Sequence, residues 1–165
     1  MACWFLCSGL IHLIIEGNVV LNSRFYTDTS GNILNEIWKE YSKADSRYAT
    51  RDDFVISMEA VTAFLEGPGC LAIVWAMLRS KPWRHTAVLA VSLGQLYGDV
   101  LYFGTCLHGG VSRHSRPEAL YFWFYFVIVN AVWIVVPLAC IAHAARAINA
   151  AVAGIETGGP RKKRA

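Results

Sequence analysis

Ionisable side chains interrupt long apolar stretches of this sequence, and they are the groups best suited to chemistry. His12 and Glu16 lie four residues apart in the first stretch, and Glu59 lies in the second. Residues four apart stack on one face of a helix, so the imidazole and the first carboxyl group should point the same way. An ionisable group at membrane depth is costly and by default marks a functional site. Two carboxyl groups and an imidazole in apolar surroundings indicate proton transfer that needs no cofactor.

Further polar side chains lie at matching positions. Thr62 follows Glu59 by three residues, and Asn130 and Trp133 are one turn apart in the last apolar stretch. Three helices can therefore aim acids, a histidine, an amide and an indole at one interior point. For Thr62 and Asn130 the alternative is a hydrogen bond between helices, which is common in membranes. A carboxylate is a poor structural link, which favours a functional role for Glu16 and Glu59.

Two other acids leave alternatives open. Glu66 precedes Gly67-Pro68-Gly69, so a helix kink explains it as well as a functional site does. Asp99 follows Gly94 and Gly98, a pair of small residues that permits close helix packing. We expect that packing within the chain, with a homodimer contact as the alternative.

Several kinds of site are missing from the sequence. No nucleotide-binding loop, zinc motif or nucleophile elbow is present, so neither a metal nor an organic cofactor is expected. The cysteines are odd in number and lie in apolar stretches, which favours small buried thiols over disulfides or metal ligands. They are Cys3, Cys7, Cys70, Cys106 and Cys140.

The composition is that of a membrane protein. Apolar residues make up 55% of the 165 residues, charged residues make up 16%, and the mean hydropathy is +0.38. These values exclude a disordered chain and a basic nucleic-acid-binding domain. A helix needs about 20 apolar residues to cross a bilayer. Four stretches are long enough and predict an all-α transmembrane bundle: about 2–21, 54–78, 83–107 and 120–147.

The remaining segments predict the orientation in the membrane. Residues 22–53 should form a loop with a short interfacial helix that places Trp38 and the tyrosines at headgroup depth. Four spans place the N-terminus, the loop 79–84 and the C-terminus on the side of the membrane opposite to this loop. Basic residues are densest in those short segments, which favours a cytosolic C-terminus. We expect a transmembrane domain over residues 1–153 and an unstructured basic tail over 154–165. Lys162 and Lys163 have the spacing of a dilysine retrieval signal for the endoplasmic reticulum, or they form a cluster that attracts anionic lipid.

Several blocks of sequence, in order, resemble the emopamil-binding (EXPERA) family of membrane proteins. The blocks are His12–Gly17, Trp38–Tyr48, Met58–Thr62, Gly94–Phe103 and Leu120–Trp133. The resemblance implies a multi-pass protein of the endoplasmic reticulum membrane and nuclear envelope, active in sterol and cholesterol biosynthesis. The expected reaction moves a ring double bond of a Δ8 sterol from the 8(9) to the 7(8) position without a cofactor. Cationic amphiphilic drugs are expected ligands, and the chain is expected to lack the family's first helix, as a short isoform would.

Carried over position by position, the resemblance implies a set of pocket residues. They are His12, Glu16, Glu59, Thr62, Asn130 and Trp133, with Met58 and Tyr48 as further lining.

The mechanistic hypothesis gives each of these side chains a task. Glu59, helped by His12, would protonate C9 and Glu16 would remove a proton from C7, or the two acids would exchange these roles. At least one acid should remain protonated, because an apolar site disfavours the charged form. Trp133 would stabilise the carbocation with its ring face. Asn130 and Thr62 would orient the carboxyl groups.

Two other functions use the same groups. A non-catalytic relative would bind sterols or amines in an acidic pocket without converting them. A proton-coupled transporter would also carry buried carboxylates, but the chain lacks the inverted repeats and paired broken helices of such proteins.

Overall fold

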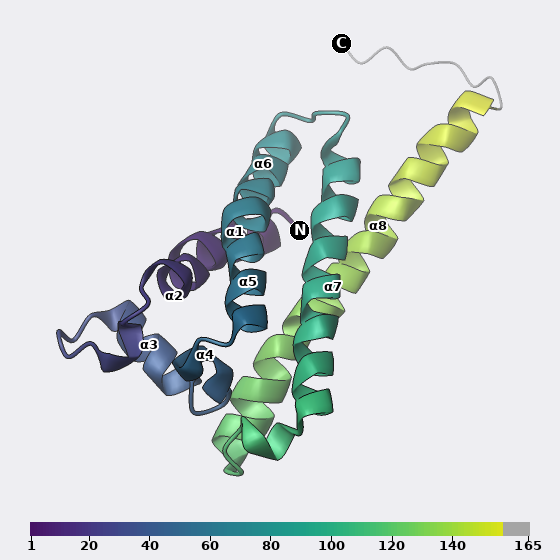
Figure 1. Cartoon of the computed structure of the whole chain (residues 1–165). Helices are drawn as coiled ribbons and strands as arrows, with labels where there is room; N and C mark the ends of the chain where they lie inside the picture. The colour runs from purple at the N-terminus through teal and green to yellow at the C-terminus, as the bar shows by residue number, and fades with distance from the viewer. Residues whose placement is uncertain (157–165) are drawn as a thin grey trace.

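A computed structural model describes residues 1–156. These residues form helices joined by loops, and they contain no strand. Four helices are long and apolar enough to cross a membrane (Figure 1). They are Ala2–Leu21, Asp53–Leu78, Arg84–Gly109 and Leu120–Glu156. This confirms the predicted all-α bundle with four spans. The predicted retrieval signal, Lys162 and Lys163, lies outside the described residues.

Three of the four spans contain a stretch of π-helix, in which hydrogen bonds run from residue i to i+5. The first and second spans are interrupted near their middle, whereas the fourth begins as a π-helix and the third is α-helical throughout. In chain order the segments are α1 (Ala2–Leu10), the π-helical turn Ile11–Glu16, α2 (Gly17–Leu21), α5 (Asp53–Val61), the π-helical turn Thr62–Glu66, α6 (Gly67–Leu78), α7 (Arg84–Gly109), the π-helical segment Leu120–Val129 and α8 (Asn130–Glu156). Such segments are rare and often occur at functional sites. The apolar periodicity of the sequence did not predict them.

The spans pack in the order α1, α6, α7, α8. α1 lies against α6, α6 against α7, and α7 along much of the long diagonal helix α8 (Figure 1). Their contacts enclose a cluster of buried side chains: Phe5, Cys70, Ile73, Val88, Cys140 and Ala144. These apolar side chains pack the four spans against one another.

The cysteine prediction is only partly right. All five thiols are free, and Cys70, Cys106 and Cys140 are buried. Cys3 and Cys7 are exposed, because α1 turns Phe5 and Ser8 inward and these two residues outward.

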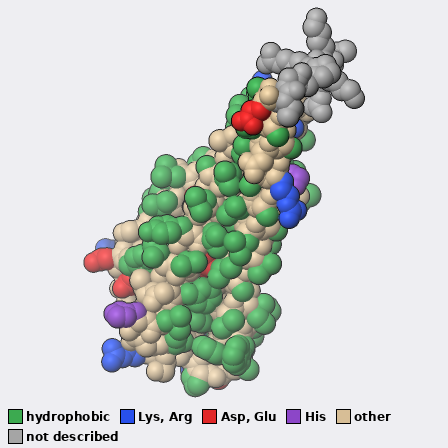
Figure 2. Space-filling view, turned by 90° about the vertical axis from the view of Figure 1, so that its right-hand side faces the viewer, with side chains coloured by type: hydrophobic (Ala, Val, Ile, Leu, Met, Phe, Trp, Pro, Cys, Tyr) green, Lys and Arg blue, Asp and Glu red, His purple; other side chains and the backbone are tan. Residues whose placement is uncertain are grey.

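The exterior of the bundle is apolar over most of its length. Figure 2 shows apolar side chains spread over one broad face, with charged side chains mainly towards its two ends. Leu93 and Val100 on α7 and Val135 and Leu138 on α8 are exposed. Such a surface suits contact with lipid chains. α8 continues to Glu156, so the helix ends later than the predicted residue 147 and includes the first residues of the predicted tail.

The long loop folds into short helices that pack against the bundle. These are the 3₁₀ turn Phe25–Thr27, α3 (Ile33–Tyr41) and α4 (Ser46–Thr50). Each of the two α-helices begins at a polar cap. The Asn32 side chain accepts a hydrogen bond from the Leu34 N–H at the start of α3, and the Asp45 side chain accepts one from the Arg47 N–H at the start of α4. The 3₁₀ turn Val111–Arg113 then connects α7 to the last span.

Trp38 and Tyr48, which the sequence predicts at headgroup depth, lie in the protein interior. Trp38 is 5% exposed and Tyr48 is 3% exposed. The Trp38 indole N–H donates to the carbonyl oxygen of Ile15 at 2.7 Å, which fixes α3 to the first π-helical turn. Both rings therefore pack inside the protein, 4.7 Å apart between centroids.

Arg47 is buried in an ion pair at the start of α4 and also contacts α7. Arg47 Nη2 lies 2.6 Å from Asp45 Oδ2, and the two side chains are 5% and 0% exposed. Arg47 Nη1 also donates to the Thr105 hydroxyl at 2.9 Å, and its guanidinium lies 4.6 Å from the centre of the Tyr102 ring. The cation therefore joins a loop helix to the C-terminal part of α7.

We expect Arg47→Met to destabilise the protein by about 3–5 kcal/mol, because it leaves the Asp45 charge buried without its partner. Unfolding in mixed detergent micelles measures the change. Arg116→Ala is the control, since it removes a half-exposed ion pair at 3.8 Å and should cost at most about 1 kcal/mol. Equal effects of the two substitutions would contradict the structural role of Arg47.

We also expect Trp38→Phe to lower the free energy of unfolding by about 1–3 kcal/mol, because the Ile15 carbonyl loses its donor while the aromatic volume is largely kept. Trp83→Phe is the matched control at a tryptophan that is 41% exposed. If the two variants unfold alike, the indole hydrogen bond does not hold α3 in place.

Candidate active site

A cavity of about 280 Å³ lies inside the bundle, with walls from all four spans and from the loop helices. All eight candidate residues of the sequence line it: His12, Glu16, Tyr48, Met58, Glu59, Thr62, Asn130 and Trp133. The π-helical turns place several of them, because His12 and Glu16 lie in the first turn and Thr62 begins the second. Positions far apart in the sequence therefore meet in one place.

His12 and Glu16 form a close pair. His12 Nδ1 lies 2.7 Å from Glu16 Oε2, and the imidazole is almost fully buried. On the other side of the ring, Gln95 Nε2 lies 3.0 Å from His12 Nε2. With the amide in this orientation its N–H donates to Nε2, so Nδ1 carries the proton that is directed at Glu16.

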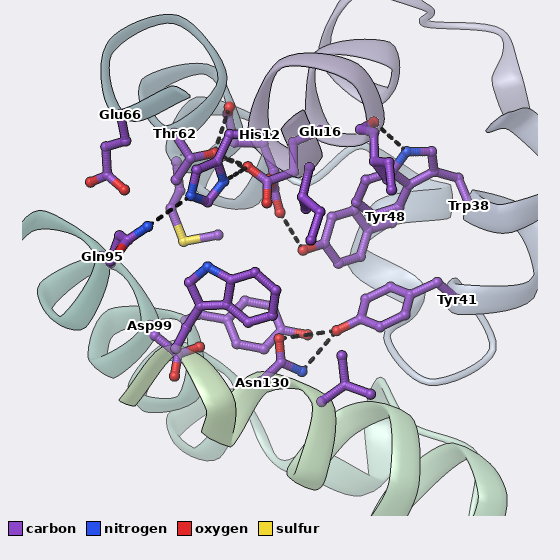
Figure 3. A pocket seen from close by; sticks show the side chains of 18 of the residues that line it. His12, Glu16, Trp38, Tyr41, Tyr48, Thr62, Glu66, Gln95, Asp99 and Asn130 are labelled. Atoms are coloured by element: carbon purple, nitrogen blue, oxygen red, sulfur yellow. Dashed lines mark hydrogen bonds and ion pairs between the residues drawn. The ribbon is translucent and has the colours of Figure 1, made fainter. Parts of the chain in front are cut away.

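Thr62 lies between the two glutamates. Its hydroxyl donates to Glu16 Oε2 at 2.5 Å and lies 3.4 Å from Glu59 Oε2 (Figure 3). The Tyr48 hydroxyl donates to the other oxygen of Glu59 at 2.5 Å. Burial, together with the nearby Glu59 carboxyl, raises the pKa of the Tyr48 phenol well above its usual range, so it remains a donor.

Two of the expected roles differ from the observed contacts. The imidazole of His12, expected to assist Glu59, contacts Glu16, as their four-residue spacing predicts. Asn130 orients no carboxyl group: its amide donates to the Tyr41 hydroxyl and to the Phe126 carbonyl, both at 2.7 Å. The reason is local, since the π-helical segment that ends at Val129 leaves backbone carbonyls for the Asn130 amide.

The remaining predicted residues contribute surface to the cavity. The Trp133 ring lies 6.3 Å from the His12 ring and 5.6 Å from the Trp4 ring, measured between centroids. Met58 packs opposite Gly98 on α7, where a side chain would come within 3.9 Å of the Met58 Cγ. The cavity therefore has an aromatic and apolar wall beside its acids.

Glu66 and Asp99 also reach the cavity. The carboxyl group of Glu66 occupies space beside Gly94: a Cβ there would lie 2.5 Å from Glu66 Oε1, so the carboxyl group would have to shift. Gly94 and Gly98 thus face neighbouring helices of the same chain, which supports the intramolecular alternative for this pair of small residues.

Sequence reasoning missed Trp38, Tyr41, Gln95 and Tyr102 as lining residues. A signal existed for two of them. Gln95, Asp99 and Tyr102 recur at intervals of three and four along α7, and all three are buried. Trp38 and Tyr41 gave no such signal, because they lie in a polar loop whose fold depends on contacts with other segments.

The acids do not gather as metal ligands. Within residues 1–156, no group of three or more histidine, cysteine, aspartate or glutamate side chains could hold a metal ion. The arrangement instead supports proton exchange, because donors and acceptors connect the imidazole, the hydroxyls and the carboxyl groups.

Comparison with known proteins identifies a family to which the chain is similar. The family model of EXPERA, the expanded EBP superfamily, matches residues 33–144. The chain is 47% identical over 149 residues to the 3-beta-hydroxysteroid-Delta(8),Delta(7)-isomerase of Mus musculus, covering 90% of this chain and 64% of that protein. It is 49% identical over 135 residues to the isomerase of the same name from Rattus norvegicus, covering 82% of this chain and 58% of that protein.

A plant relative carries a different name. The chain is 40% identical over 139 residues to a protoglabretal synthase from Citrus sinensis, covering 84% of this chain and 64% of that protein. The chain spans less than two thirds of the length of each of these three relatives. The family match and these identities confirm the resemblance of the sequence blocks, and the chain belongs to the EXPERA family.

Proposed function

We propose that the chain isomerises 3β-hydroxysterols by moving a ring double bond from the 8(9) to the 7(8) position. The observation that carries this proposal is the meeting of Glu16 and Glu59, from different spans, at the Thr62 hydroxyl inside one cavity. Two carboxyl groups in a dry site favour holding one proton between them, because two like charges there repel. The reaction needs one acid and one base.

The proton steps balance within this pair. Glu59 gives its proton to C9 of the 8(9) double bond, which leaves a tertiary carbocation at C8. Glu16 takes a proton from C7, and the electrons of that C–H bond form the 7(8) double bond. Glu16 then holds the proton and Glu59 is charged, so a transfer past Thr62 restores the starting state.

The hydrogen bonds favour Glu16 as the base. Its Oε2 faces both His12 Nδ1 and the Thr62 hydroxyl, and two donors stabilise a carboxylate. Glu59 faces one strong donor, Tyr48. His12 therefore assists the base in this proposal and not the acid.

The aromatic wall suits the intermediate. The face of the Trp133 ring can stabilise a desolvated cation by about 2 kcal/mol. A protonated amine in an apolar molecule carries the same charge, so we propose that cationic amphiphilic drugs bind in this cavity. Stabilisation aimed at the charge that develops during reaction lowers the barrier selectively.

We further propose that the protein works in the endoplasmic reticulum membrane and nuclear envelope, with its C-terminus in the cytosol, in sterol and cholesterol biosynthesis. The four apolar helices and the basic segments at one end of the spans support this location and orientation.

We expect Glu16→Gln and Glu59→Gln each to reduce turnover of a Δ8 sterol by at least about 100-fold, since general acid–base catalysis typically contributes about 100- to 10,000-fold. Gas chromatography of the sterols formed by the purified full chain measures the effect. Glu118→Gln, at an acid whose side chain is 53% exposed, is the control.

Near wild-type conversion by both glutamine variants would show that the acid–base assignment is wrong. A wild-type chain that binds the Δ8 sterol but never forms the Δ7 isomer would instead identify a non-catalytic binding protein.

Trp133→Phe should lose less activity than either glutamine variant, about tenfold or less, because phenylalanine keeps an aromatic face with a weaker attraction for the cation. Trp123→Phe on the same span is the control at a ring that is 59% exposed. A loss at Trp133 as large as that of Glu59→Gln would mean that the indole has another task.

A further inference from the structure

Three oxygen atoms at one side of the cavity have no hydrogen-bond partner among residues 1–156: Glu66 Oε2, Gln95 Oε1 and Asp99 Oδ2. Glu66 and Asp99 are each 9% exposed and Gln95 is 3% exposed. A buried acceptor without a partner costs about 1–3 kcal/mol. The mechanism above uses none of the three oxygens.

All three atoms are acceptors, which determines what can satisfy them. The Gln95 amide nitrogen already contacts His12 Nε2 at 3.0 Å and donates to Cys70 Sγ at 3.7 Å, so both of its N–H groups have partners. A carboxyl group that holds a proton still offers its second oxygen as an acceptor. A ligand group that enters here gains most if it donates a hydrogen bond, as a hydroxyl does and an ether or a hydrocarbon does not.

Outside this group, the lining atoms without a partner among residues 1–156 are the Tyr102 hydroxyl and the Trp133 indole N–H, and each of these can donate a hydrogen bond. Figure 3 shows Glu66, Gln95 and Asp99 on one side and Trp38, Tyr41 and Tyr48 on the other. The Tyr41 hydroxyl is already bonded to Asn130, and the Tyr48 hydroxyl to Glu59. That side is therefore an aromatic surface suited to hydrocarbon.

A 3β-hydroxysterol has matching polarity. Its hydroxyl lies on the first ring, near the double bond, and its hydrocarbon side chain lies at the far end. The three acceptors adjoin the proton-transfer groups, because Gln95 lies 3.0 Å from His12.

We propose that Glu66, Gln95 and Asp99 form the binding site for the sterol 3β-hydroxyl, with the sterol side chain directed towards Trp38 and Tyr41. This inference rests on the proposed function and adds the direction in which the substrate lies. In this proposal the 3β-hydroxyl group determines which sterols the site accepts.

The test compares a Δ8 3β-hydroxysterol with its 3-deoxy and 3β-methoxy analogues on the full chain. Wild-type protein should prefer the hydroxyl compound by at least about tenfold in kcat/KM, since a site built for a hydroxyl strongly rejects analogues that lack it. The methoxy compound should behave like the deoxy compound, because it accepts but cannot donate. Equal use of all three by wild-type protein would overturn the proposal without any variant.

The variants locate the effect. In Asp99→Leu and Glu66→Leu the preference for the 3β-hydroxyl compound over the 3-deoxy compound should fall to within about threefold of unity, because each variant removes an acceptor that serves only the hydroxyl. Glu66→Gln retains an acceptor and should keep most of the preference. Val100→Leu, beside Asp99 but on the exposed face of α7, is the control. Leucine variants that retain the wild-type preference would overturn the site.

Failure of the two proposals can be told apart. If wild-type protein converts Δ8 sterols but does not distinguish the analogues, only the hydroxyl site is wrong. If it converts none of them, the isomerase proposal fails, and equilibrium binding of the same three compounds to wild-type protein and both leucine variants still tests the site.

Discussion

The carboxyl groups of Glu16 and Glu59 can lie inside an apolar helix bundle only if other segments supply their hydrogen-bond partners. A buried charge without partners is far too costly to persist in such surroundings. The partners come from three places: His12 on the same span as Glu16, Thr62 on the second span, and Tyr48 on a loop helix. Separation of the first two spans would remove the Thr62 donor from Glu16, so a contact that gives the site its chemistry also joins these two helices.

The π-helical segments place the side chains that make these hydrogen bonds. Their wider turns hold His12 and Glu16 on the first span and Thr62 and Glu66 on the second, and the third segment ends just before Asn130. Each π-helical turn gives up regular α-helical bonding in the middle or at the start of an apolar span. The polar contacts across the cavity offset that loss, and the loop helices close over them through Trp38 and the Arg47–Asp45 pair.

The sequence was sufficient to predict the class of fold and eight of the residues that line the site. Four long apolar stretches fixed the spans, and the four-residue spacing of His12 and Glu16 predicted their contact, because both signals are local. The task of His12 as a helper of Glu59 and the role of Asn130 were predicted wrongly, since they depend on the rotation of one helix against another and on π-helical geometry. Trp38 was expected at the membrane surface because its loop is polar, and only the folded structure shows that α3 turns this ring inward.

Gly94 on α7 leaves space that the Glu66 carboxyl group occupies. A methyl group at this position would lie 2.5 Å from Glu66 Oε1, which is the end of a flexible side chain, so the carboxyl group would have to turn away from its present place. The next residue along α7 is Gln95, whose amide contacts the imidazole of His12. The bare backbone at residue 94 therefore reserves room for a polar group in an otherwise crowded helix contact, and alanine there would compete with the acid for that room.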